Sequence, residues 1–232
     1  MAERVDLPTA TPGVLMVGID DSPPPPMELG EPGSTEFSGF EVDILDAVAG
    51  RLRLALRYRR AVWSQILDEL ERGLIDVVCT AATFTPERAR QFDYGRPYLD
   101  MALGVVVRDE EPGERDGVGG RFAVRSATTA ERWIHEHLEP AEVLTFEYNA
   151  DTYEALLDHR ADAVVDDSPI AAWFVGQMDG LRYLHSLPGT ESHYAMVFAK
   201  GSPLRVPIDA EIERLDAAGT LDTWKRRWFE AG

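Results

Sequence analysis

Apolar and polar residues alternate along the first third of the chain in a pattern that predicts strands and helices in turn. Residues 14–19 form a short apolar run typical of a buried strand, and residues 40–52 repeat apolar side chains at helical spacing. Residues 54–59 and 75–79 predict two more strands, with a helix over residues 64–72 between them. This order favours a βαβαβ unit with a parallel sheet.

The same alternation continues beyond this unit. Residues 101–107 predict another strand, and residues 109–120 are charged and rich in Pro and Gly, so we expect them to form an exposed loop. After that loop we expect strands at 122–124, 143–146, 163–165 and 193–198, and helices at 128–138, 152–159, 169–175, 203–217 and 221–229. Two sets of βα units predict an α/β protein with two lobes, in which ligands bind beyond the carboxyl ends of the strands.

Composition changes this picture mainly by excluding partners. The 232 residues include 23 Lys and Arg against 41 Asp and Glu, and the net charge of −18 disfavours binding to nucleic acid or to an anionic membrane. No apolar run approaches the roughly 20 residues of a membrane-spanning helix. Cys79 is the only cysteine, so it cannot form a disulfide within the chain, and no zinc-binding spacing is present. We therefore expect no cofactor and no metal.

Arg88 is the strongest candidate for contact with an anion. It follows the strand at 75–79 and opens a short polar helix, with Thr85 as a candidate N-cap. Backbone N–H groups at a helix start can converge with a guanidinium on one anion, and the planar fork of Arg suits a carboxylate better than Lys does. The alternative is a surface arginine that pairs with Glu87 or Asp93.

Asp166 and Asp167 form a second candidate site, directly after the strand at 163–165. Adjacent carboxylates at a strand end can hold an ammonium or a metal, or act as acid and base. An aspartate before Ser-Pro can equally be a helix cap, and two aspartates without further ligands are a weak metal signal.

Three other features lie near expected strand ends. The turn at 125–129 is rich in hydroxyls and offers a second place for backbone N–H groups to meet an anion, although it lacks the Gly and Lys of a Walker loop. Asp20 ends the first strand. Trp63 starts a helix, where it can form an apolar wall or pack in the core. No nucleophile motif of the Gly-x-Ser-x-Gly type occurs.

Several of these segments together resemble one family, in order and nearly from end to end. The resemblance is to the type 2 periplasmic solute-binding proteins, and more narrowly to the amino-acid-binding family of ABC importers, the bacterial extracellular solute-binding proteins of family 3. The matching segments are GFEVDILDAVAGRL (39–52), GLIDVVCTAATFTPERARQFDYGRPY (73–98), VRSATTAE (124–131), ADAVVDDSP (161–169), YAMVFAKGS (194–202) and GTLDTWKRRWF (219–229).

The resemblance implies an α/β fold of the type II periplasmic binding proteins. Two lobes, each a mostly parallel sheet flanked by helices, are joined by two crossing hinge strands in that fold. We expect lobe 1 to comprise residues 1–99 and 195–232 and lobe 2 to comprise residues 100–194, with hinges near 96–101 and 190–195.

The resemblance also implies roles for the candidate residues. Arg88 would hold the α-carboxylate of the ligand, helped by Thr83 and the backbone near Ala81, and by Thr129 from the second lobe. Asp167 would hold the α-ammonium. Because a zwitterion needs a cation and an anion, and each lobe supplies one, closure of the lobes would depend on the ligand. The side-chain pocket would be lined by Asp20, Trp63, Arg125 and Asp166.

The function implied is that of a receptor, not an enzyme, which captures a small amino acid for the membrane subunits of an ABC importer. Asp20 and Asp166 favour a cationic side chain and Arg125 a polar or acidic one, so we expect a polar ligand. Pro23 and Pro26 stand where the family usually has aromatic residues, so one aromatic wall of the pocket is absent.

We expect a monomer in the periplasm or another extracytoplasmic space, without direct membrane insertion. Residues 1–12 show no signal peptide, so either the chain is cytoplasmic, or a signal segment has been removed, or the domain comes from a larger protein. Together with the resemblance, this leads us to expect that a signal segment has been removed from this chain.

Two alternatives use the same scaffold. Cyclohexadienyl dehydratases resemble these binding proteins but carry an acidic residue three positions after the aspartate that corresponds to Asp167. That position is Ile170 here, which cannot transfer a proton, although Asp166 is a possible substitute. The other alternative is a ligand-sensing domain of a receptor, with the same fold and the same site.

Overall fold

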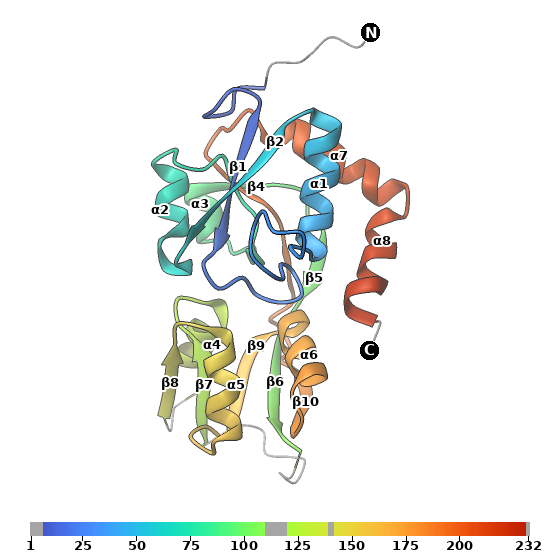
Figure 1. Cartoon of the computed structure of the whole chain (residues 1–232). Coiled ribbons are helices and arrows are strands. Elements are labelled where there is room, and N and C mark those ends of the chain that lie inside the picture. Colours follow the sequence, from blue (N-terminus) through green and yellow to red (C-terminus); the bar gives the residue numbers. More distant parts are fainter. Residues whose placement is uncertain (1–6, 110–119, 139–141, 231–232) are drawn as a thin grey trace. The chain divides into compact units, whose positions relative to one another are not determined.

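The structure is a computed structural model that describes residues 7–109, 120–138 and 142–230. It separates into two compact units (Figure 1). Unit 1 comprises Met1–Asp100 and His193–Ala231, and unit 2 comprises Met101–Ser192. Each unit contains one five-stranded sheet with helices packed on it.

The sheet of unit 1 has the strand order β2-β1-β3-β12-β4. As expected from the alternating pattern, β1 pairs in parallel with β2 and β3, whereas β12 pairs antiparallel with β3 and β4. Leu15, Val17 and Ile19 are fully buried, so β1 is an inner, apolar strand of the sheet. The strands are β1 (Val14–Asp20), β2 (Ala55–Ala61), β3 (Val77–Val78), β4 (Phe92–Tyr94) and β12 (Val197–Ala199).

Helices lie on both sides of β1, with α2 on one side and α1, α7 and α8 on the other (Figure 1). Ile66 and Leu70 of α2 pack with Val78, Phe92 and Val197 of the sheet in one buried cluster. The helices are α1 (Phe40–Leu52), η1 (Trp63–Gln65), α2 (Ile66–Glu71), α3 (Arg88–Gln91), α7 (Arg205–Ala217), α8 (Thr220–Lys225) and the π-helical turn η2 (Arg226–Glu230).

The sheet of unit 2 has the order β10-β6-β9-β7-β8. Strand β7 pairs in parallel with β8 and β9, and β6 pairs antiparallel with β9 and β10. Every residue of β9 is buried, so the aspartates at its end are carried by a central strand. The elements are β6 (Leu103–Arg108), β7 (Arg121–Arg125), α4 (Thr129–His137), β8 (Glu142–Phe146), α5 (Asn149–Leu157), β9 (Ala163–Asp167), α6 (Ser168–Gln177) and β10 (Leu181–Ser186).

The chain passes twice between the units, once in β5 (Leu99–Met101) and once in β11 (Ser192–Tyr194). These two short strands pair with each other in a two-stranded sheet. That the two segments act as hinges stays a prediction.

Several expected elements differ from the structure. The strand expected at 193–198 is interrupted at Ala195 and Met196, and belongs partly to β11 and partly to β12. The strand expected at 101–107 likewise breaks at Ala102, between β5 and β6. The two aspartates expected after the strand at 163–165 are the last residues of β9. Strands β4 and β10 were not expected. All but the first and last residue of the loop expected at 109–120 lie outside the described residues.

Candidate functional site

Arg88 of unit 1 lies against two other candidate residues. Its Nη1 donates to the Thr83 carbonyl at 3.2 Å, and its guanidinium carbon lies 5.1 Å from the centre of the Trp63 ring. The Tyr94 hydroxyl also donates to the Thr83 carbonyl, at 3.1 Å. The structure therefore brings Arg88, Thr83 and Trp63 together, and fixes the cation over an aromatic face.

Thr85 caps the turn that leads to Arg88, as expected. Its hydroxyl accepts the Arg88 backbone N–H at 3.2 Å, although the residue that precedes the helix directly is Glu87. The cap therefore engages the Arg88 N–H. Helix α3 is only four residues long, so the guanidinium is the main feature here that can hold an anion.

Ala81 adopts a left-handed backbone conformation with φ of 49°. Its N–H points at the carboxylate of Glu41, and the nitrogen lies 3.0 Å from each carboxylate oxygen. The Ala81 N–H is therefore engaged inside unit 1 and does not contact a ligand in this arrangement. If the backbone near Ala81 contacts a ligand, it does so through groups other than the Ala81 N–H.

Asp20 is completely buried at the end of β1. Its Oδ1 accepts the Ser22 N–H at 3.1 Å, and its own N–H donates to the Thr80 hydroxyl at 3.2 Å. That hydroxyl donates in turn to Glu28 Oε2 at 3.0 Å. Burial, together with the charge of Glu41, raises the pKa of Glu28 well above its usual range. Asp20 thus belongs to a buried acidic network that the sequence did not suggest.

In unit 2, Asp167 and Thr129 lie together. Asp167 is the last residue of β9 and is 8% exposed, and Thr129 is the first residue of α4. The Thr129 hydroxyl donates to Asp167 Oδ1 at 3.4 Å. The two residues come from β9 and α4, which pack against each other.

Asp166 accepts three hydrogen bonds within unit 2. Its Oδ2 accepts from Asn149 Nδ2 at 2.7 Å and from the Tyr153 hydroxyl at 3.0 Å, and its Oδ1 accepts the Asp167 N–H at 2.8 Å. Burial, together with the neighbouring charge of Asp167, raises the pKa of Asp166 to about 7. Asp166 therefore supports the backbone at Asp167.

Arg125 is connected to Asp166 through Asn149. Its Nη1 donates to Asn149 Oδ1 at 3.2 Å and its Nε donates to the Glu147 carbonyl at 2.8 Å. Arg125 and Asp166 were both expected to face the ligand side chain, and that role stays a prediction. Asn149 and Tyr153 were not singled out from the sequence, because they join the network only through the packing of α5 on β7 and β9.

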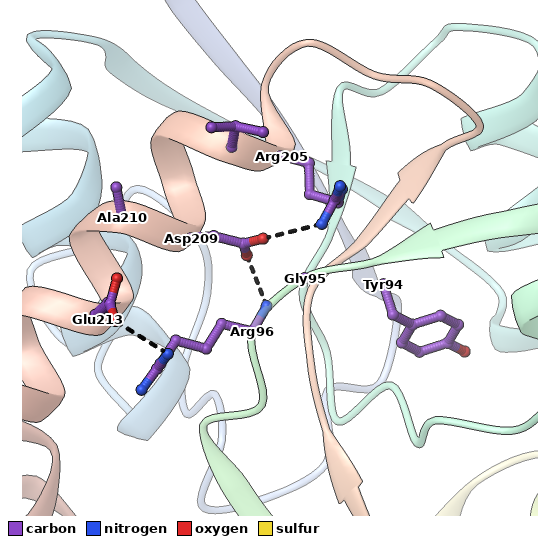
Figure 2. Close-up of a pocket in the computed structure, with 8 residues that line it drawn as sticks. Tyr94, Gly95, Arg96, Arg205, Asp209, Ala210 and Glu213 are labelled. Carbon is purple, nitrogen blue, oxygen red and sulfur yellow. Dashed lines mark hydrogen bonds and ion pairs between the residues drawn. The ribbon is translucent and has the colours of Figure 1, made fainter.

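A separate pocket of about 480 Å³ lies on unit 1 between β4 and α7 (Figure 2). Its charged side chains pair among themselves, as Arg96 does with Glu213 at 3.5 Å and Arg205 with Asp209 at 3.4 Å. Asp209 also accepts the Arg96 N–H at 2.6 Å. Arg88 does not line this pocket, so it is distinct from the candidate site.

Within the described ranges, His, Cys, Asp and Glu nowhere gather in a group of three or more that could hold a metal ion. Cys79 is a buried free cysteine, and burial raises the pKa of its thiol well above the usual range, which is typical of an unreactive thiol. Among all the residues that the structure describes, no helix has the length and apolar character needed to cross a membrane.

Comparison with known families decides the relationship that these features suggest. The family model of the bacterial extracellular solute-binding proteins, family 3, matches residues 15–231. This chain belongs to that family.

Individual solute-binding proteins are distant in sequence but cover most of the chain. The L-cystine-binding protein TcyJ of Escherichia coli (strain K12) is 25% identical over 224 residues, which is 94% of this chain and 84% of that protein. The glutamine-binding protein GlnH of the ABC transporter of Bacillus subtilis (strain 168) is 24% identical, over 87% of this chain and 76% of that protein.

Solved structures show the same fold, that of the type II periplasmic binding proteins. The substrate-binding protein of an amino acid ABC transporter superposes with a TM-score of 0.85 at 26% identity, over 94% of this chain and 100% of that one. The ancestral amino acid-binding protein AncCDT-1, described as a precursor of cyclohexadienyl dehydratase, gives a TM-score of 0.83 at 26% identity, over 94% and 96%. In the chain of 232 residues described above, the position three residues after Asp167 is Ile170, which lies buried in α6.

Proposed function

We propose that this solute-binding protein captures a small, polar α-amino acid and delivers it to an ABC importer. The observation that carries the proposal is the pairing of functional groups in each unit: a cation with Thr83 in unit 1, and a buried carboxylate with Thr129 in unit 2. An α-amino acid carries the two complementary charges. The relatives are described as binding cystine or glutamine, which are both of this class.

Arg88 supplies the carboxylate-binding half. A guanidinium offers parallel N–H donors that match both oxygens of a carboxylate, and its hydrogen bond to Thr83 and its contact with the Trp63 ring limit its rotation. A ligand that meets a guanidinium already held in place loses less conformational freedom on binding.

Asp167 supplies the ammonium-binding half. A carboxylate that is 8% exposed is poorly hydrated, so an ammonium partner replaces hydration that burial has removed. The Thr129 hydroxyl and the backbone bond to Asp166 limit the positions that the carboxylate can take. Arg88 and Asp167 belong to different units, so a ligand held by both would connect them.

The experiment that tests this function is calorimetric titration of variants with L-amino acids and with analogues that lack one charged group. Arg88→Ala should abolish binding, and Asp167→Asn should weaken it by about 30-fold or more, because truncating one partner of a buried charge pair costs 2 kcal/mol or more. The amine analogue, which lacks the carboxylate, should bind neither wild type nor Arg88→Ala.

Each unit offers a matched control. Arg90 lies on the same short helix as Arg88 and is exposed, so Arg90→Ala should retain wild-type affinity. Asp158 is exposed at the end of α5, so Asp158→Asn should do the same. Unchanged affinity in Arg88→Ala would show that the carboxylate assignment is wrong.

A further inference from the structure

Glu41 is a completely buried acid, although it is only the second residue of α1. Both of its carboxylate oxygens accept the Ala81 N–H, and Oε1 also accepts the hydroxyl proton of Tyr98. A carboxylate taken out of water needs such donors, because otherwise it is strongly destabilised. Glu41 is therefore tied to the backbone of Ala81, which follows it by 40 residues.

Ala81 has a conformation that needs outside support. Its φ of 49° lies in the left-handed region, which costs a residue with a Cβ about 1 kcal/mol or more relative to the right-handed region. Residues of this kind persist where surrounding contacts hold them. The bond from the Ala81 N–H to Glu41 is such a contact, and it lies two residues before Thr83, whose carbonyl orients Arg88.

Glu41 is a member of this buried cluster whose charge changes near neutral pH. Burial raises its pKa to about 7, although the hydrogen bonds from Tyr98 and Ala81 lower it. The groups that face it are Glu28, Cys79 and Tyr98, and burial raises the pKa of each well above its usual range. Cys79 and Tyr98 therefore stay neutral at pH 7. Asp20 faces Glu28 from the end of β1.

We propose that Glu41 is a positioning residue for the ligand, which acts through Ala81: by accepting the Ala81 N–H, it holds residues 80–83 in the conformation that presents Thr83 and Arg88. This inference rests on the proposed function, since it assumes that Arg88 holds the ligand carboxylate. An ionised carboxylate accepts through both oxygens, whereas a protonated one carries a hydrogen on one of them. The hold on Ala81 therefore weakens when Glu41 gains a proton.

Affinity across pH is the first test, with L-glutamine, L-arginine, L-histidine and L-cystine as probes. At pH 8, Glu41→Gln should bind about tenfold more weakly than wild type, the loss expected for one hydrogen bond to a charged group. At pH 5.5 wild type has itself lost most of the charge, so the ratio should fall to about threefold or less. Asp166 also titrates in this range, but it is present in both proteins and cancels in the ratio.

A general effect of replacing an acid by an amide is controlled with Glu71→Gln, an exposed carboxylate at the end of α2 in the same unit. This variant should match wild type at both pH values. An affinity ratio for Glu41→Gln that stays at one, or that does not change with pH, would overturn the proposal.

Rescue by glycine separates positioning from a merely structural role. Glycine adopts positive φ without strain, so adding Ala81→Gly to Glu41→Gln should restore most of the lost affinity. Ala127 is the matched control, because it also has positive φ, of 59°, at the end of a strand, but donates its N–H to Glu131. Adding Ala127→Gly to Glu41→Gln should restore none. Equal rescue by the two glycines would contradict the proposal.

A measurement without ligand distinguishes failure of this inference from failure of the proposed function. In wild type labelled with ¹⁵N-alanine, the Ala81 amide resonance, identified by its loss in Ala81→Gly, should shift with a midpoint near pH 7. If none of the common amino acids binds wild type, the proposed function fails, and the titration of this resonance alone then tests the role of Glu41. If the resonance does not titrate, the inference fails even where amino acids bind. This test uses wild type, so it holds if Glu41→Gln does not fold.

Discussion

Two alanines with positive φ, Ala81 and Ala127, stand in the loops that follow β3 and β7. Each donates its N–H to a glutamate carboxylate: Ala81 to the buried Glu41 at 3.0 Å and Ala127 to Glu131 at 2.7 Å. An alanine gives no hint of left-handed backbone in the sequence, because glycine usually takes that role. Each unit thus stores a small amount of strain close to a residue proposed to bind the ligand.

Asp166 gives a prediction about stability and pH. Its pKa is about 7 in the folded protein, compared with about 3.9 in an unfolded chain. Between these values the folded state keeps a proton that the unfolded state has released, so the stabilisation is full below about pH 4 and is lost as pH rises through 7. Relative to Asp166→Asn, wild type should lose on the order of 2 kcal/mol between pH 5 and pH 8.

Urea denaturation of the two proteins at several pH values in that range measures this difference. Glu41 titrates in both proteins, so its effect cancels. The exposed Asp158→Asn serves as the control and should follow wild type at every pH. A difference between wild type and Asp166→Asn that stays constant with pH would mean that Asp166 does not titrate as described.

At the scale of elements, the start of α1 depends on a close approach of two backbone segments. The Phe40 N–H donates to the Pro26 carbonyl and the Glu41 N–H donates to the Met27 carbonyl, each at 3.0 Å. These bonds satisfy N–H groups that a helix start otherwise leaves open. Gly39 has φ of 155°, and a Cβ there would lie 2.1 Å from the Met27 carbonyl oxygen. The glycine of the GFEVDIL segment is therefore required by this contact.

Gly39→Ala should lower the free energy of unfolding by roughly 3 kcal/mol, because backbone atoms of residues 27 and 28 have to move. Gly50 in the same helix is the opposite case, since a Cβ there meets nothing within 4 Å. Gly50→Ala should stabilise the protein by about 0.5–1 kcal/mol. Denaturant unfolding measures both variants, and equal effects of the two would refute the packing argument.

Elements with a strong local pattern could be predicted from the sequence, and elements defined by distant partners could not. The expected helix at 40–52 matches α1, because its apolar stripe spans the whole element. Strand β4 is only three residues long, and it pairs with β12, which lies about a hundred residues further along the chain. No local sequence pattern therefore predicts this strand. Strand β10 lies at a sheet edge and is half exposed, which removes the apolar signal.

The residues of the candidate site also differ in whether the local sequence singles them out. Arg88 and Asp167 stand in recognisable motifs at strand ends, and their roles stay predictions. Glu41 had one available signal: it lies one helical turn before Leu45, so it places a charge on the apolar stripe of α1. Its partner Ala81 could not be inferred from that signal, because the contact depends on how α1 packs in unit 1.

At the scale of the whole molecule, we propose that one ligand is held by charged residues from both units. A ligand that binds only the folded protein stabilises it by about 2.7 kcal/mol at 100 times its Kd. For a chain of 232 residues this corresponds to a rise in Tm of about 5–10 °C. Binding at either unit alone would also raise Tm, so the chemical class of the ligand carries the information.

Thermal unfolding against a ligand panel tests whether this protein binds a polar amino acid. The protein is first unfolded and refolded to remove bound ligand, then heated with each common amino acid, with small dicarboxylates and with prephenate. We expect a rise in Tm of about 5–10 °C with one or a few polar amino acids. This rise should be present in Arg90→Ala and absent in Arg88→Ala. A rise only with carboxylates that lack the amine, or only with prephenate, would contradict the claim that this protein binds an amino acid.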